Sequence, residues 1–106
     1  MDNFKAVYKI LSALEKMMDL PEVNVDLISA EKLEVSKERW ARYLEMMADV
    51  EYIKGVDFSK DITGEYIVDA RNIRITLKGL EYLQENSIMQ KLYKAAKGLK
   101  EITPGA

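Results

Sequence analysis

The sequence predicts a single α+β domain, mostly helical: a winged helix-turn-helix with a small antiparallel β-wing and an additional C-terminal helix. Amphipathic and capping patterns run in the order helix, short strand, helix, helix. Two segments rich in Val, Ile and Tyr follow, separated by a polar loop, and further helical segments come after them. In a winged helix the wing likewise follows the second helix of a helix-turn-helix pair.

Composition limits the classes of function open to this chain. Its 106 residues include no His and no Cys, which excludes thiol nucleophiles, imidazole acid–base catalysis, disulfides and the usual zinc sites. The formal net charge is −2, so the whole molecule is not a polycation. No apolar run approaches the roughly 18 residues of a membrane helix, and the N-terminus lacks the apolar core of a signal peptide. We therefore expect a cytoplasmic protein without cofactor or metal.

No repeat, low-complexity tract or linker divides the chain. We expect one domain over residues 1–106, with a winged-helix core at 1–86, a C-terminal helix at 87–102 and a tail at 103–106. The first helix is predicted from about Asn3 to Met18, with Asp2 as its N-cap. Its apolar stripe comprises Phe4, Val7, Tyr8, Leu11, Leu14 and Met18, widened by Ile10 and Met17.

That apolar arc covers well over half of the first helix, so we expect it to contact neighbours on two sides or another subunit. The alternating residues Val23–Val25 then predict a minor strand. Two helices follow: Ser29 caps Ala30–Glu34, and Ser36 caps Lys37–Val50. The core stripe of the second comprises Trp40, Tyr43, Leu44, Met47 and Val50.

The wing is predicted from two segments of strand character, Tyr52–Phe58 and Glu65–Ala70. The polar loop Ser59–Gly64 lies between them, and its glycine can adopt a positive φ. After a turn or a bulge at Arg71 and Asn72, the residues Ile73–Ile75 alternate again.

Two more helices complete the prediction. Thr76 caps a helix that runs through Asn86. Ser87 and Gln90 then match a capping box for a last helix, from Ile88 to about Glu101.

Several segments of the sequence resemble the YjcQ family of small bacterial and bacteriophage proteins. The resemblance is carried by Leu27–Leu33, Trp40–Leu44, Tyr52–Gly55, Ile75–Ser87 and the pair Tyr93-Lys94. It implies a winged-helix-like fold and an association with prophage regions, and it carries over no active site. The chain departs from similar proteins at Glu51, where they tend to have a glycine at the end of the helix. A non-glycine residue is strained in the left-handed conformation, so we expect this helix to end by another route.

The leading hypothesis for function is DNA binding in a phage-related or regulatory setting, by analogy of fold. Lys37–Val50 would enter the major groove, and the wing loop would contact the backbone. Arg42 is the best single candidate for a base contact, because a guanidinium binds guanine bidentately. Its alternative role is an ion pair with Glu45 or Glu38. The candidate residues for binding double-stranded DNA are Lys37, Arg39, Arg42, Lys54, Lys60, Arg71, Arg74, Lys91, Lys94 and Lys97.

The charge pattern argues against strong DNA affinity. The predicted outward face of the second helix carries two basic and three acidic residues and comprises Lys37, Glu38, Ala41, Arg42, Glu45, Ala48 and Asp49. The wing loop offers Lys60 against the acidic residues Asp57, Asp61 and Glu65. Positive charge gathers instead in residues 87–106, which hold four lysines and one glutamate. Those lysines recur every three residues beside an apolar face, as Lys91, Lys94, Lys97 and Lys100. They would form either a phosphate-contacting strip or a solvated helix face.

No catalytic motif accompanies these features. The eighteen carboxylates are dispersed, without an Asp-x-Asp cluster, a glycine-rich phosphate loop or a Ser–Lys motif. We therefore expect no enzymatic activity. The alternative function is a phage-related adaptor that uses the fold to bind a protein rather than DNA. The apolar arcs of the first and last helices also predict a homodimer through these terminal helices.

Overall fold

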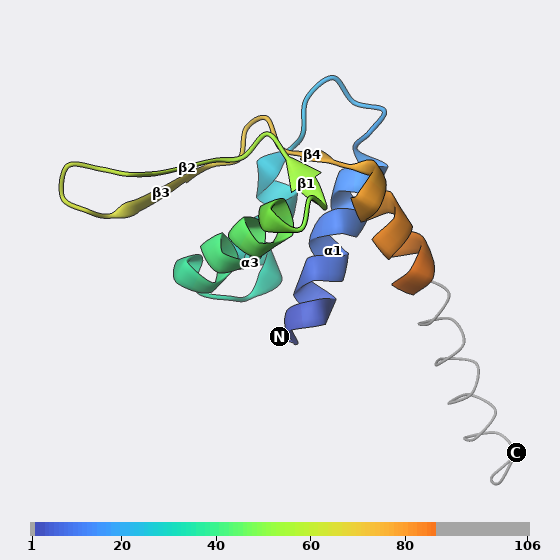
Figure 1. Ribbon diagram of the computed structural model, residues 1–106, viewed down its shortest axis with the longest axis horizontal. Coiled ribbons are helices and arrows are strands. Elements are labelled where there is room, and N and C mark those ends of the chain that lie inside the picture. Colours follow the sequence, from blue (N-terminus) through green and yellow to red (C-terminus); the bar gives the residue numbers. More distant parts are fainter. Residues whose placement is uncertain (1, 87–106) are drawn as a thin grey trace, which may run out of the picture.

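The computed structural model describes residues 2–86, an α+β arrangement that is about half helical. Its helices are α1 (Asn3–Lys16), the 3₁₀ helix η1 (Val25–Ile28), α2 (Ala30–Leu33), α3 (Lys37–Asp49) and a helix over residues 77–86. Its antiparallel strand pairs are β1 (Ile53–Lys54) with β4 (Arg74–Ile75), and β2 (Asp57–Lys60) with β3 (Tyr66–Asp69). The hairpin of β2 and β3 extends away from the helices (Figure 1). The predicted C-terminal helix at 87–102 and the tail at 103–106 lie outside the described residues.

Helix α1 begins as predicted, but two of its predicted core residues are exposed. The carboxylate of Asp2 accepts hydrogen bonds from the amides of Phe4 at 2.8 Å and Lys5 at 3.2 Å. The buried residues are Ala6, Ile10, Leu11, Leu14 and Met17. The predicted core positions Phe4 and Met18 are wrong, because they are 76% and 57% exposed. Helix α3, η1 and β4 all contact α1, yet they leave part of its wide apolar arc uncovered.

The predicted strand at Val23–Val25 is absent. The side chain of Asn24 accepts a hydrogen bond from the amide of Asp26 at 3.2 Å, and its carbonyl accepts one from Leu27 at 3.1 Å. These bonds start η1, because asparagine caps turns and short helices readily. As a result, each sheet in the described part of the chain has two strands.

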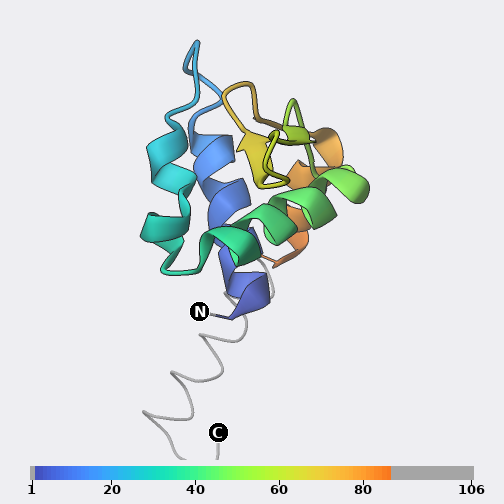
Figure 2. The ribbon, with the colours of Figure 1, turned by 90° about the vertical axis from the view of Figure 1, so that its left-hand side faces the viewer.

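The serine caps of the next two helices are confirmed. The hydroxyl of Ser29 accepts from the amide of Lys32 at 3.2 Å, and that of Ser36 accepts from Arg39 at 3.1 Å. Figure 2 shows α1, α2 and α3 packed together as the helical part of the body. Helix α3 buries Ala41, Tyr43, Leu44 and Met47. The predicted core residue Val50 is 50% exposed, because the helix ends at Asp49 and Val50 leaves the stripe.

Helix α3 ends in the left-handed conformation, so the expectation of another route was wrong. Glu51 has a φ of 64°. Its amide donates to the carbonyl of Ala48 at 3.0 Å, and the amide of Tyr52 donates to Met47 at 2.8 Å. This is the Schellman pattern, and its hydrogen bonds offset the steric cost of a side chain at this position. Glu34 ends α2 in the same way, with a φ of 57°.

The predicted strand Tyr52–Phe58 is divided into β1 and β2 at Gly55. This glycine has a φ of 81°, and a Cβ there would lie 2.0 Å from the carbonyl oxygen of Asn72. Strand β2 continues through Lys60, so the loop is shorter than predicted and spans residues 61–65. Gly64 adopts the predicted positive φ, at 84°.

The predicted turn at Arg71 and Asn72 leads into β4, and the cap of the following helix is confirmed. The hydroxyl of Thr76 accepts from the amide of Gly79 at 3.1 Å. The same hydroxyl donates to the carbonyl of Glu51, and the amide of Thr76 donates to Tyr52 at 3.0 Å. Thr76 therefore joins the start of the helix over residues 77–86 to the end of α3.

Candidate functional site

The three predicted DNA-binding residues on α3 do not all line the same surface. Lys37 and Arg42 are exposed and line a groove between α3 and the hairpin. Arg39 is also exposed, but its guanidinium donates to the side-chain oxygen of Asn3 at 2.8 Å. That oxygen also accepts from the hydroxyl of Tyr43 at 2.6 Å, so Arg39 joins α3 to the start of α1.

The predicted cations of the strands and of the turn before β4 are not gathered at this groove. Lys54 and Lys60 are exposed, and neither lines it. Arg71 and Arg74 line a different depression, together with Glu22. Lys91, Lys94 and Lys97 lie outside the described residues.

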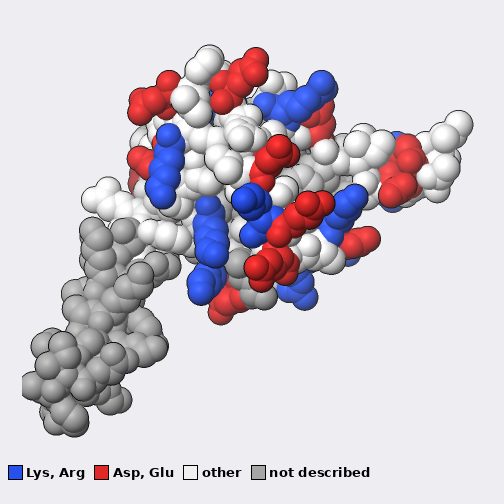
Figure 3. All heavy atoms as spheres, turned by 180° about the vertical axis from the view of Figure 1, so that it is seen from behind, with Lys and Arg blue, Asp and Glu red and all other residues white. Residues whose placement is uncertain are grey.

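Arg71 and Arg74 are engaged by oxygens of the protein itself. Arg71 forms a two-point contact with Asp69, at 3.0 Å from Nε to Oδ1 and 2.8 Å from Nη2 to Oδ2. Those hydrogen bonds from Arg71 lower the pKa of Asp69 to about 2. The guanidinium of Arg74 donates to the carbonyl of Ile73 at 2.8 Å. Acidic and basic side chains are interspersed on the face in Figure 3, and a continuous basic patch is not seen there.

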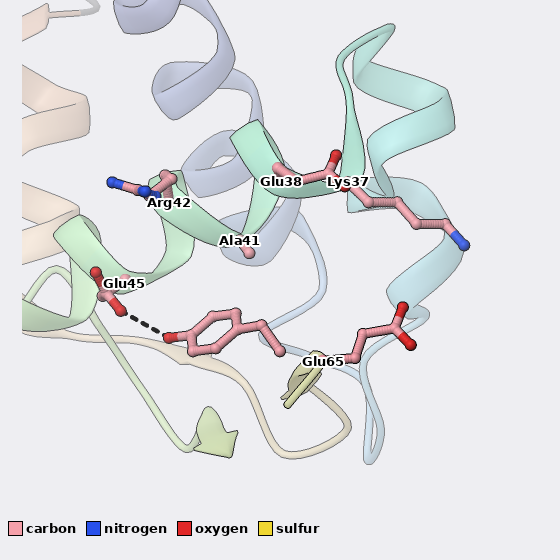
Figure 4. Close-up of a pocket in the computed structure, with 7 residues that line it drawn as sticks. Lys37, Glu38, Ala41, Arg42, Glu45 and Glu65 are labelled. Carbon is pink, nitrogen blue, oxygen red and sulfur yellow. Dashed lines mark hydrogen bonds between the residues drawn. The ribbon is translucent and has the colours of Figure 1, made fainter. Parts of the chain in front are cut away.

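The groove between α3 and the hairpin is closed on one side by Tyr66. Its hydroxyl donates to Oε2 of Glu45 at 2.6 Å and ties β3 to α3. This part of the groove has a volume of about 560 Å³ and is lined by Lys37, Glu38, Ala41, Arg42, Glu45, Glu65 and Tyr66. In Figure 4, Lys37 and Glu65 extend toward one end, whereas Arg42 lies at the other end with Glu45.

A second part of the groove, of about 510 Å³, lies between β3 and the segment of η1 and α2. It shares Lys37, Ala41, Glu65 and Tyr66 with the first part, so the two are continuous past the Tyr66 ring. We call the whole feature the α3–hairpin groove. Its additional lining residues are Val25, Asp26, Ser29, Ala30, Glu31, Trp40, Asp61, Ile67 and Val68.

The surface of this groove contains a substantial apolar part. The indole Nε1 of Trp40 donates to the carbonyl of Ile28 at 2.7 Å, so its polar atom is satisfied within the protein. The Trp40 ring is therefore left with apolar surface to offer to a ligand. Ala41, predicted to face outward, is only 7% exposed. On the hairpin side, Tyr66 and Ile67 are 40% and 44% exposed.

The charged residues of the α3–hairpin groove are mostly acidic. Its two cations are Lys37 and Arg42, and its six carboxylates are Asp26, Glu31, Glu38, Glu45, Asp61 and Glu65. Hydrogen bonds from Thr63 and from the amide of Glu65 lower the pKa of Asp61, which favours its ionised form. An anionic surface of this kind attracts ligands that carry lysine or arginine and repels phosphate.

Sequence reasoning missed two of these six carboxylates, Asp26 and Glu31. It counted the charges of Lys37–Val50 and of the wing loop as two separate elements. The carboxylates of Asp26 and Glu31 belong to η1 and α2, and the hairpin brings them beside Asp61 and Glu65. Residues so distant in the sequence carry no local signal of their proximity. The sequence shows that Asp26 and Glu31 are acidic, but it does not show that they line the same groove as the hairpin.

The carboxylates of the groove are spread along it rather than converged on a point. Within residues 2–86 there is no group of three or more His, Cys, Asp or Glu side chains able to hold a metal ion. No helix in that same part of the chain combines the length and the apolar character needed to cross a membrane. The groove has an apolar floor, formed by the less exposed Trp40, Ala41 and Val68, and an acidic rim that includes the exposed Glu31, Glu38 and Glu65.

Comparison with known proteins identifies the family of this chain. No curated protein and no solved structure shows significant similarity to this chain. The model of the YjcQ family, described as YjcQ protein, matches residues 8–102. That match covers most of the chain, including every helix and strand described above apart from the first residues of α1. The chain therefore belongs to the YjcQ family.

Proposed function

We propose that this protein is a non-enzymatic winged helix-turn-helix module that binds a basic segment of a protein partner in the α3–hairpin groove. The observation that carries the proposal is the set of six carboxylates against two cations around an apolar floor. The order of α2, α3 and the hairpin supports the winged-helix assignment. The proposed setting is cytoplasmic and phage-related, and the module would act as an adaptor.

DNA binding is the alternative, and the charges around α3 disfavour it. Nonspecific DNA affinity depends on cations that replace the counterions of the phosphates. On α3, Glu38 and Glu45 lie within one turn of Arg42, and Glu65 extends from the hairpin beside Lys37 (Figure 4). These carboxylates would be brought toward the phosphates if α3 entered a major groove.

A titration with two probes separates the two functions. Trp40 is the sole tryptophan and lines the groove, so its emission reports on occupancy there. One probe is a synthetic amphipathic peptide with several lysines, and the other is a labelled random DNA duplex. Both are titrated at low and at physiological salt. We expect the peptide to shift Trp40 emission saturably and the duplex to leave it unchanged.

The variants K37E and R42E identify which probe uses this face. Each adds negative charge to the groove, so each should tighten or preserve peptide binding. If the duplex binds wild type and both variants abolish that binding, while the peptide has no effect, DNA binding replaces the proposal. The exposed Lys78, which lies outside the groove and is not among the DNA-binding candidates, provides a matched control as K78E.

A further inference from the structure

We infer that residues 87–102 of a second copy of this chain occupy the α3–hairpin groove, so that the protein associates with itself through this site. The inference rests on the proposed function, because it names one occupant of the same groove. It combines the geometry of the groove with the sequence pattern of the segment.

Charge complementarity is the first argument. Residues 1–86 contain twelve Lys and Arg against seventeen Asp and Glu, whereas residues 87–106 contain four against one. The acidic excess of the described residues includes the six carboxylates of the groove. One part of the chain therefore carries the charge that another part attracts.

The apolar pattern is the second argument. Beside the lysine row, Met89, Leu92, Ala96 and Leu99 recur at helical spacing. A segment with lysines flanking an apolar stripe matches a groove with an acidic rim and an apolar floor. Trp40, Ala41 and Tyr66 would receive the apolar side chains, while Glu31 and Glu65 would lie near the lysines.

The position of residue 86 favours a second copy over the same copy. The helix over residues 77–86 lies on the opposite side of the body from the hairpin, and it leads away from it (Figure 1). To reach its own groove, the following segment would have to pass around the body. The groove of a second molecule imposes no such path.

Paired charge reversals in the full chain test the inference. The variant E31K/E65K reverses two exposed groove carboxylates, and K91E/K94E reverses two lysines of the segment. Sedimentation velocity at low salt should show concentration-dependent association for wild type. Each variant alone should raise the dissociation constant about tenfold or more, because like charges then face each other. An equimolar mixture of the two variants should recover association, since opposite charges meet again.

The control variant E15K/D19K makes the same change of net charge on exposed residues outside the groove. This control should associate as wild type does. In both proteins, Trp40 emission should change with association. Far-UV circular dichroism confirms that each variant is folded. Wild type that stays monomeric at high micromolar concentration overturns the inference, as does a mixture that recovers nothing.

A direct peptide titration separates this inference from the proposed function. A peptide of residues 87–106 and a scrambled peptide of the same composition are titrated against the K91E/K94E protein, with Trp40 emission as the readout. Tighter binding of the native order supports the inference. Equal binding of both orders overturns it but leaves the proposed basic-ligand site standing. If neither peptide binds, and the amphipathic lysine peptide does not bind either, both proposals fail.

Discussion

At the scale of single residues, two glutamates occupy a conformation that favours glycine. Glu34 and Glu51 have φ values of 57° and 64°, and each ends a helix with the hydrogen bonds of a Schellman motif. The amide and carbonyl groups supply these bonds whatever the side chain is. The side chain adds only a steric cost, which tertiary contacts of Thr76 with Glu51 and Tyr52 help to offset.

Replacing Glu51 with glycine should therefore stabilise the protein. We expect E51G to raise the free energy of unfolding by about 1 kcal/mol, because glycine adopts a positive φ without a Cβ clash. Urea denaturation followed by Trp40 emission measures this change. The control E51A keeps a Cβ and should differ little from wild type. A destabilised E51G would mean that the Glu51 side chain itself holds this turn.

Two glycines of the strand region share a positive φ but differ in their surroundings. A Cβ on Gly55 would lie 2.0 Å from the carbonyl oxygen of Asn72, whereas one on Gly64 would meet no atom within 4 Å. G64A should thus cost about 1 kcal/mol from backbone strain alone. G55A should cost more than about 2 kcal/mol, because the crossing backbone must also move. Equal thermal stability of the two variants would contradict this account of the break between β1 and β2.

At the scale of elements, a side-chain hydrogen bond ties the hairpin to α3, in addition to the packing of Phe58 and Val68 against the core. The hydroxyl of Tyr66 donates to the Glu45 carboxylate, and this bond raises the pKa of Tyr66 above its ordinary value of 10.0. Phe58 stacks on the Tyr66 ring from β2, with centroids 6.1 Å apart. The hairpin is thereby held beside α3, and its carboxylates become part of the groove.

The variant Y66F should release the hairpin from α3 while leaving the protein folded. The ring and its stacking on Phe58 remain, but Glu45 loses its donor. We expect faster hydrogen exchange in β2 and β3 and weaker binding of the lysine peptide. Exchange rates identical to wild type would show that the hydroxyl does not position the hairpin.

The same bond gives a dependence on pH with a definite sign. A raised pKa favours the protonated tyrosine, so the contact is complete below pH 10 and is lost as the pH rises through the raised value. Trp40 emission of wild type should therefore change on alkaline titration in this range. Y66F should lack that part of the change, after correction for the other five tyrosines.

Among the elements, the helix caps were predicted more accurately than the first strand and the buried face of α1. The caps at Asp2, Ser29, Ser36 and Thr76 were predicted correctly, because each involves hydrogen bonds within three residues of the cap. The strand at Val23–Val25 was wrong, because alternation of two valines was outweighed by the capping bond of Asn24. The buried face of α1 was misplaced at both ends, because Phe4 lies in the exposed first turn and Met18 follows the end of the helix.

At the scale of the whole molecule, charge is segregated along the chain, and several acidic residues gather around one groove. The acidic residues of η1, α2, α3 and the hairpin meet around one groove, while the basic excess follows residue 86. Such an arrangement suits association governed by ionic strength, since exposed charges interact over about 10 Å at 0.1 M salt. This distribution, rather than the net charge of −2, connects the fold to the proposed binding function.

The sequence by itself determined the α+β class, the order of the α-helices and the hairpin, most helix starts and the family. These features depend on hydrophobic periodicity and on hydrogen bonds between near neighbours. Only the tertiary structure decided which charges share a surface and which cations are engaged by the protein's own oxygens. Asp26 and Glu31 line the same groove as Asp61 and Glu65, because the hairpin of β2 and β3 lies beside α3, to which Tyr66 ties it. Contacts between residues so far apart in the chain arise from packing, and local sequence does not encode them one by one.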